Sequence, residues 1–185
     1  MYAVFCRLVR DAGTGAVFVP AIPCAPQHSV LLLDSIEKQL VEKKEEKYAF
    51  FICDIDNFKQ VNDRFGHAFG DYCICSFTKA IREHFRKDNI LGRIGGDEFL
   101  IALIAPVDMT ASNVEQTAQR IIKAINQPFY CENHKIQVGC SIGSAVFPGD
   151  STEPQTVIKY ADKALYYSKS HDKNRLTSYA SIGGE

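Results

Sequence analysis

The chain has 185 residues, of which 46% are hydrophobic and 23% charged, and its formal net charge is −1. This length can bury one sizeable core, and the near-neutral charge argues against a nucleic-acid partner. No apolar run approaches the roughly 20 residues of a membrane helix, and the start lacks a signal-peptide pattern, so we expect a cytoplasmic protein without a membrane segment.

The cysteine pattern points to free thiols. Seven cysteines are an odd number, and their spacing contains no C-x-x-C motif. Neither a disulfide framework nor a zinc knuckle is therefore indicated. Because free cysteine is among the most buried residue types, we expect reduced and mostly buried thiols.

The first 28 residues have the least regular pattern. Residues 4–9 and 16–19 flank a glycine-containing turn, which predicts a hairpin, and residues 19–27 form a loop interrupted by prolines. We assign residues 1–28 to an N-terminal extension of uncertain role, which could also be the tail of a sensor domain. Residues 29–185 form the main predicted domain.

A helix and a buried strand open the main domain. Ser29 can cap the helix, whose apolar face has helical spacing and consists of Val30, Leu33, Ile36 and Leu40. Residues 48–54 follow as a continuous apolar run that ends in an acid. Such a run is typical of a strand buried on both faces.

The rest of the chain alternates helices with strands. In chain order it predicts helices at 58–65 and 70–86, a hairpin of two apolar strands around residue 95, a helix at 111–126, a second hairpin at 129–138, a strand at 139–146, a helix at 155–170 and a strand at 176–179. Hairpins imply antiparallel neighbours. The fold class we predict is an α/β sandwich with a mainly antiparallel central sheet flanked by helices.

The tip of the first hairpin carries the most distinctive residues. Residues 93–99 read Arg-Ile-Gly-Gly-Asp-Glu-Phe. Gly95 and Gly96 allow positive φ and let a bulky anion approach the bare backbone, while Asp97 and Glu98 add two carboxylates. A tip of this kind can hold a metal and a phosphate.

A third carboxylate comes from the end of the buried strand. Asp54 has no evident lysine partner nearby in the sequence, and an unpaired buried carboxylate is costly. Asp54, Asp97 and Glu98 would repel one another unless a cation neutralised them, and hard divalent ions prefer oxygen ligands. We therefore predict one Mg²⁺ (or Mn²⁺) site.

Four separate segments resemble a known family, the GGDEF-domain diguanylate cyclases. They are residues 51–71, 93–99, 141–148 and 160–169, and their order and spacing agree with the family from about residue 29 to 179. The resemblance implies the palm-like architecture of nucleotidyl cyclases. The family's usual Asp-x-Leu-Thr-Gly-Leu-x-Asn-Arg turn survives only in fragments near the start of this chain.

The resemblance implies roles for the acidic residues. Asp54, Asp97 and the backbone carbonyl of Ile55 match the family's metal ligands, and Glu98 would support the metal or the nucleotide. Asp97 also matches the suspected general base for the 3′-hydroxyl. For Asp56 two interpretations stay open, an outer support of the metal site or a helix N-cap.

Another group matches the family's guanine pocket. Asn62 and Asp71 correspond to the guanine-reading residues, and guanine offers adjacent N1–H and N2–H₂ donors to a carboxylate. His67 lies in the same pocket in the family, although a structural hydrogen bond is nearly as good an explanation.

The phosphate contacts form the last group. Backbone amides at Asn57 and Phe58 would cradle phosphate oxygens, and Lys59 matches a phosphate and transition-state contact. Lys169 matches the phosphate-binding lysine of the last helix. Lys173 stands where the family usually has arginine, which keeps the charge but loses the bidentate fork.

The resemblance implies a diguanylate cyclase that condenses two GTP molecules into cyclic di-GMP and two pyrophosphates as a two-fold homodimer. The alternatives are a catalytically weak domain that senses GTP or cyclic di-GMP, and a cyclase or polymerase-like transferase with relaxed base choice. The family's Arg-x-x-Asp product-inhibition site falls on Arg86 and Asn89. Because Asn89 replaces the acid, we expect that site to be degenerate.

Overall fold

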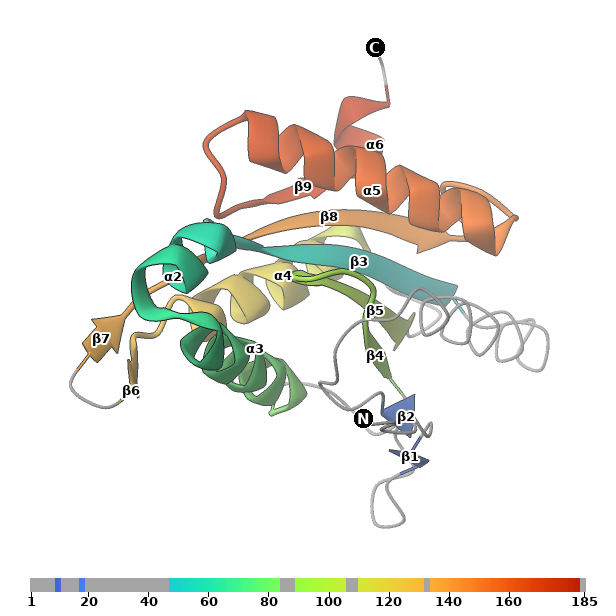
Figure 1. Cartoon of the computed structure of the whole chain (residues 1–185). Helices are drawn as coiled ribbons and strands as arrows, with labels where there is room; N and C mark the ends of the chain where they lie inside the picture. The colour runs from blue at the N-terminus through green and yellow to red at the C-terminus, as the bar shows by residue number, and fades with distance from the viewer. Residues whose placement is uncertain are drawn as a thin grey trace.

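The computed structural model describes residues 9–10, 17–18, 47–83, 89–105, 110–131 and 134–183. These residues form a seven-stranded sheet with helices on both faces (Figure 1). Across the sheet the strands are β1 (Val9–Arg10), β2 (Val17–Phe18), β4 (Ile90–Arg93), β5 (Glu98–Ala105), β3 (Lys47–Asp56), β8 (Gly139–Phe147) and β9 (Leu176–Ser178). Neighbouring strands are antiparallel except for the parallel pairs β2–β4 and β8–β9. The predicted α/β sandwich with a mainly antiparallel sheet is confirmed.

The helices and a small second sheet complete the described structure. They are α2 (Phe58–Phe65), α3 (His67–Arg82), α4 (Ala111–Ile125), α5 (Pro154–Ser170), α6 (Tyr179–Ile182) and the hairpin of β6 (Phe129–Cys131) with β7 (His134–Ile136). Figure 1 shows α5 on one side of the sheet and α3 and α4 on the other. The described helices include none that is both long and apolar enough to cross a bilayer.

Some element boundaries differ from the predicted ones. The helix predicted from residue 70 begins at His67, because Gly66 has φ 85° and separates α2 from α3 within a single residue. The short α6 takes the place of the end of the last predicted strand. The helix predicted to start at Ser29 lies outside the described residues. The predicted N-terminal hairpin is present as the antiparallel pair β1–β2.

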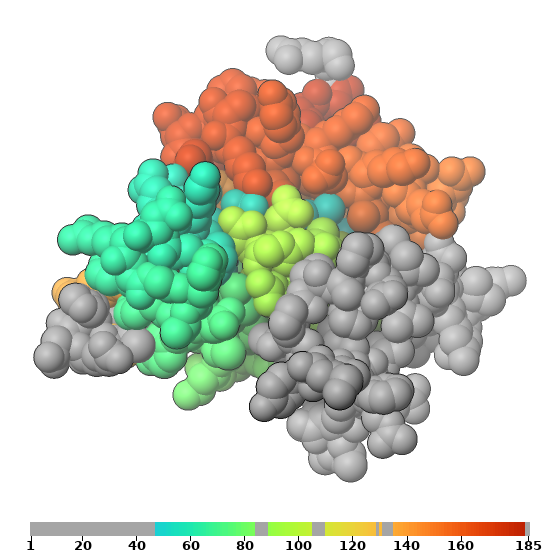
Figure 2. All heavy atoms as spheres, in the orientation of Figure 1, coloured from blue at the N-terminus to red at the C-terminus, as the bar shows by residue number. Residues whose placement is uncertain are grey.

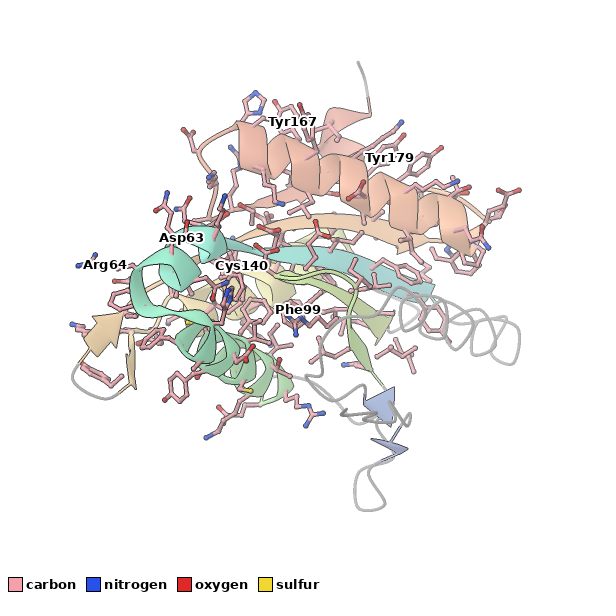
Figure 3. All side chains as sticks on the ribbon, in the orientation of Figure 1. Asp63, Arg64, Phe99, Cys140, Tyr167 and Tyr179 are labelled. Carbon is pink, nitrogen blue, oxygen red and sulfur yellow. The ribbon has the colours of Figure 1, made fainter. Side chains whose placement is uncertain are left out.

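β3 lies at the centre of the sheet, paired with β5 on one side and β8 on the other. Its odd-numbered residues face a core that includes α2, α3 and α4, and its even-numbered residues face α5. Phe99 of β5 and Cys140 of β8, both labelled in Figure 3, belong to the first of these cores. Burial on both faces explains the continuous apolar run of the strand.

The second face is closed by a tight contact between α5 and β8. A Cβ at Gly143 would collide with the backbone of Ala161 and Leu165 in α5, so only glycine allows this approach. Because side chains alternate along a strand, Asp54 and Asp56 project from β3 toward this same face. The acids at the end of β3 therefore lie on the side covered by α5.

The described cysteines agree with the expected chemistry. Cys53, Cys73 and Cys140 are buried, Cys75 is exposed, and all four are free thiols. Burial raises the pKa of Cys140 well above its usual value, and the neighbouring Cys53 raises it further. The Cys140 thiol is therefore protonated, and the three buried cysteines pack as small apolar groups.

Candidate active site

The acidic hairpin between β4 and β5 occupies the centre of one face of the molecule. In Figure 2 its yellow-green atoms lie between α2, in blue-green, and α5, in orange. The hairpin meets the end of β3 in register, with Asp54 opposite Glu98 and the amide of Ile55 donating to the carbonyl of Asp97 at 3.2 Å. Cross-strand partners share a face of the sheet. The fold thus brings together the three acids that the sequence singled out.

Asp54 has a partner that sequence reasoning missed. Lys169 of α5 donates from Nζ to Asp54 Oδ2 at 2.7 Å, and the same Nζ lies 3.9 Å from Glu98 Oε1. The sequence showed no lysine partner near Asp54, and the structure supplies a distant one. The two residues are 115 positions apart in sequence, and only the close packing of α5 on β8 brings them together.

The pKa of Asp54 shows that the ionised carboxylate is still destabilised in this position. The pKa is raised from 3.8 to about 6: burial is the largest cause, the charges of Asp97 and Glu98 also raise it, and the hydrogen bond from Lys169 lowers it in part. One ammonium does not offset three neighbouring carboxylates. The end of β3 is therefore an attractive place for further positive charge.

The carboxylates of the site suit a divalent ion that is bound together with the phosphates of a substrate. Among the described residues no group of three or more His, Cys, Asp or Glu side chains forms a ready-made metal cage. Mg²⁺ commonly takes one or two carboxylates and completes its shell with water and substrate phosphates. Desolvated Asp54 beside Asp97, already attracting one cation, suits that mode of binding.

The glycines of the hairpin tip do not serve the first of the two purposes predicted for them, a positive φ. Among the described glycines only Gly66 has a positive φ, so the expectation of positive φ at Gly95 or Gly96 is wrong. A Cβ at Gly95 would lie 2.6 Å from Glu98 Oε2, whereas one at Gly96 would meet nothing within 4 Å. Gly95 makes room for Glu98, and Gly96 leaves the tip open.

Arg93 holds this tip together. Its Nε donates to the carbonyl oxygens of Gly95 and Gly96 at 3.1 and 3.0 Å, and its Nη2 also donates to Gly96. The arginine opens the motif, but sequence reasoning gave it no role. Spacing alone does not show that its guanidinium folds back over the turn.

The first turn of α2 forms the next part of the site. Asn57 has φ 59° and precedes the helix, whose first N–H groups have no partner within the helix. Lys173 donates from Nζ to Asn57 Oδ1 at 3.1 Å, and Lys59 is exposed one residue beyond Phe58. The predicted phosphate contacts Asn57, Phe58, Lys59 and Lys173 are therefore gathered at one place, next to Asp54.

Asp56 is not the N-cap of α2, one of the two interpretations that the sequence left open. The N-cap of α2 is Asn57, not Asp56, so the N-cap interpretation is wrong. Asp56 accepts instead from Ser141 Oγ at 2.7 Å and from the amide of Asn174 at 2.9 Å. It ties the loop after α5, which carries Lys173, to the end of β3.

The α2–α3 junction holds the residues predicted to read the base. Of the described residues, Asn62 is one of two with a buried side-chain oxygen that lacks a hydrogen-bond partner. A Cβ at Gly70 would collide with this Oδ1, and exposed Asp71 follows Gly70 directly. His67 is exposed at the first position of α3. The unpaired amide oxygen of Asn62 and the carboxylate of Asp71 are both acceptors, which the donor edge of guanine requires.

The predicted inhibitory site is described only in part. Asn89 accepts through Oδ1 from the amide of Ile104 at 3.2 Å, whereas Arg86 lies outside the described residues. Asn89 thus has a structural partner on β5.

Comparisons with known proteins agree with this geometry. The family model described as "Diguanylate cyclase, GGDEF domain" matches residues 30–175. Diguanylate cyclase A of Treponema denticola is 35% identical over 136 residues, which cover 73% of this chain and 36% of that protein. The bifunctional diguanylate cyclase/cyclic di-GMP phosphodiesterase MucR of Pseudomonas aeruginosa is 31% identical over 147 residues, covering 78% of this chain and 21% of that protein. The chain thus spans only a fifth to about a third of these relatives.

A solved structure of a GGDEF domain has the same fold as this chain. The GGDEF domain of DgcB from Caulobacter crescentus, in complex with cyclic di-GMP, superposes with a TM-score of 0.72 at 27% identity, covering 94% of this chain and 99% of that one. The family match extends over most of the chain. The chain therefore belongs to the GGDEF family of diguanylate cyclases.

Proposed function

We propose that this domain is an active diguanylate cyclase, which converts two GTP molecules into cyclic di-GMP and two pyrophosphates. One observation carries the proposal: the acidic hairpin, whose Glu98 lies opposite Asp54 of β3, is placed between α2 and α5 (Figure 2). The family match and the intact Gly-Gly-Asp-Glu-Phe sequence support it. With GTP as substrate, we expect the reaction to take place in the cytoplasm.

Each domain would bind one GTP. Asn62 and Asp71 accept hydrogen bonds from the N1–H and N2–H₂ groups of guanine, which supplies the orphan oxygen of Asn62 with a donor. The amides of Asn57 and Phe58 and the ammonium groups of Lys59 and Lys173 hold the phosphates. These residues fix the base and the triphosphate at opposite ends of α2.

The acids would hold Mg²⁺ (or Mn²⁺) through Asp54, Asp97 and the carbonyl of Ile55, with Glu98 in support. When bound, the metal supplies Lewis-acid stabilisation of charge on the phosphate oxygens. Asp97 accepts the proton of the 3′-hydroxyl. The 3′-oxygen then bonds to the α-phosphorus of the other nucleotide, and the bond from that phosphorus to the departing pyrophosphate breaks.

Catalysis would need two copies of the domain. A two-fold axis makes both attacks equivalent and mirrors the symmetry of the product. The open space at Gly96 and the 40% exposure of the Glu98 side chain leave access for the second nucleotide. We expect a homodimer in the catalytic state.

One incubation separates the cyclase from its alternatives. Concentrated protein is mixed with Mg²⁺ and either GTP or ATP, the products are identified by mass, and the Asp97→Asn variant serves as the blank. We expect cyclic di-GMP from GTP and no product from ATP. Unchanged GTP in the presence of measurable GTP binding would favour the sensor, and cyclic products from ATP would favour relaxed base choice. We also propose weak product inhibition, because Asn89 replaces the family's acid.

A further inference from the structure

Lys169 occupies an unexpected place for a residue that the family resemblance assigns to phosphate. Its ammonium lies on the buried oxygen of Asp54 and near Glu98, at 2.7 and 3.9 Å. It thus neutralises the carboxylates that we propose as ligands of a divalent ion. An ammonium and a metal ion on one carboxylate repel each other, because both are cations at short range in a poorly solvated site.

The surroundings of Lys169 let its head group move. The residue lies in the last turn of α5, which ends at Ser170, and its side chain is 35% exposed against 9% for Asp54. A lysine carries its charge on a flexible four-carbon stem. The ammonium can therefore leave Asp54 without any change in the backbone of α5.

A triphosphate bound near Asn57 would give the displaced ammonium of Lys169 a new partner. Asn57, at the phosphate-binding turn, directly follows the segment of β3 that carries Asp54, and Lys173 already lies on Asn57 Oδ1. A triphosphate bound at this turn would bring anionic oxygens close to Asp54. Lys169 then exchanges a carboxylate for a phosphate, so its charge stays compensated.

We propose that Lys169 takes the metal's place on Asp54 in the nucleotide-free domain and yields it only when a triphosphate arrives to accept the ammonium. This inference rests on the proposed function. Divalent metal and nucleotide then bind as a unit, and the domain has low affinity for either the bare ion or the metal-free nucleotide. Burial lowers the pKa of Lys169, but Asp54, Glu98 and Asp97 together raise it above its usual value, so the group remains an ammonium ion.

The test measures the metal alone, without turnover. Mn²⁺ is titrated into the nucleotide-free protein at about pH 8, where Asp54 is ionised, and free Mn²⁺ is followed by electron paramagnetic resonance. The variants are Lys169→Met, Lys169→Gln and Lys169→Arg. Lys159→Met, an exposed residue of the same helix, gives the same change in net charge away from the acids.

We expect Lys169→Met and Lys169→Gln to bind Mn²⁺ at least tenfold more tightly than wild type, while Lys169→Arg and Lys159→Met match wild type. The two neutral variants should also lose affinity for a non-hydrolysable GTP analogue in the presence of Mg²⁺. Thermal unfolding confirms that each variant is folded, and Asp54→Asn combined with Lys169→Gln should abolish the gain.

Equal Mn²⁺ affinity for wild type and both neutral variants would overturn the inference and leave the cyclase proposal intact. A gain with Lys159→Met of the same size would also overturn it, because a general charge effect would then suffice. Wild-type protein that binds no GTP analogue would refute the proposed function. Tighter Mn²⁺ binding by the neutral variants would still show that Lys169 competes with the metal for Asp54.

Discussion

Burial of Asp54 disfavours its ionised form more than the hydrogen bond from Lys169 stabilises it. Its pKa of about 6 means that the carboxyl group is easier to protonate in the folded chain than in the unfolded one. A raised carboxyl pKa contributes stability at low pH, and this contribution is lost as the pH rises from about 4 to about 6. The ionised side chain is retained at a cost to stability, as is common in sites that bind cations.

Replacement of Asp54 by asparagine should therefore stabilise the folded protein in a pH-dependent way. We expect the difference in unfolding free energy between Asp54→Asn and wild type to grow in favour of the variant from about pH 4 to pH 6, by up to about 3 kcal/mol. Urea unfolding at a series of pH values without metal measures this difference. A difference that does not change with pH would show that Asp54 ionises normally in the folded state.

Asp71 should decide which base is accepted. Asp71→Ala removes the carboxylate that accepts from guanine, which should weaken GTP binding by about 1–3 kcal/mol and leave ATP binding unchanged. Calorimetry with non-hydrolysable GTP and ATP analogues measures both affinities. Asp63→Ala is the matched control, because Asp63 is an exposed acid on α2 and is labelled in Figure 3. If Asp71→Ala keeps the wild-type preference for GTP, the base is read elsewhere.

The loop between α5 and β9 depends on long-range anchoring. Asp172, Lys173 and Asn174 all have positive φ, a conformation that asparagine and aspartate tolerate better than lysine. The amide of Asn174 donates a hydrogen bond to the carboxylate of Asp56. The amide of Lys173 also donates locally, to the carbonyl of Ser168 at 3.2 Å. The bond from Asn174 to Asp56 adds a long-range anchor, so the position of the Lys173 ammonium depends on β3 as well.

Asp56→Ala should consequently act through Lys173. We expect it to reduce affinity for the GTP analogue by about as much as Lys173→Met, and the double variant to be no weaker than either single one. Ser141→Ala removes one partner of Asp56 and the 3.2 Å bond that Ser141 Oγ accepts from the amide of Asn174. It leaves the 2.9 Å bond from that amide to Asp56, so it should have the smaller effect. Calorimetry with Mg²⁺ present measures all four variants. Additive losses would mean that Asp56 and Lys173 act independently.

The sequence predicted the elements better than their mutual contacts. The apolar run of β3, the two hairpins and the helix at 111–126 follow local patterns, and the structure contains them. The bonds from Lys169 to Asp54 and from Asn174 to Asp56 join residues 115 and 118 positions apart. Periodicity carries no information about such pairs, because they depend on how α5 packs across β8.

On the scale of the whole molecule, the open face that carries the hairpin predicts dependence on a second copy. Specific activity should rise with protein concentration and level off once pairs dominate, because each product needs two nucleotide-loaded domains. Initial rates over a hundredfold range of concentration, with the molecular mass followed by light scattering, measure this. Constant specific activity from a protein that remains monomeric would contradict the two-domain mechanism.

The most direct test of the account is a crystal structure with Mn²⁺ and a non-hydrolysable GTP analogue, in which anomalous scattering locates the metal. The account predicts Mn²⁺ on Asp54, Asp97 and the carbonyl of Ile55, guanine on Asn62 and Asp71, and Lys169 on a phosphate oxygen. A metal bound away from Asp54, or Lys169 still on Asp54 with the nucleotide in place, would contradict it.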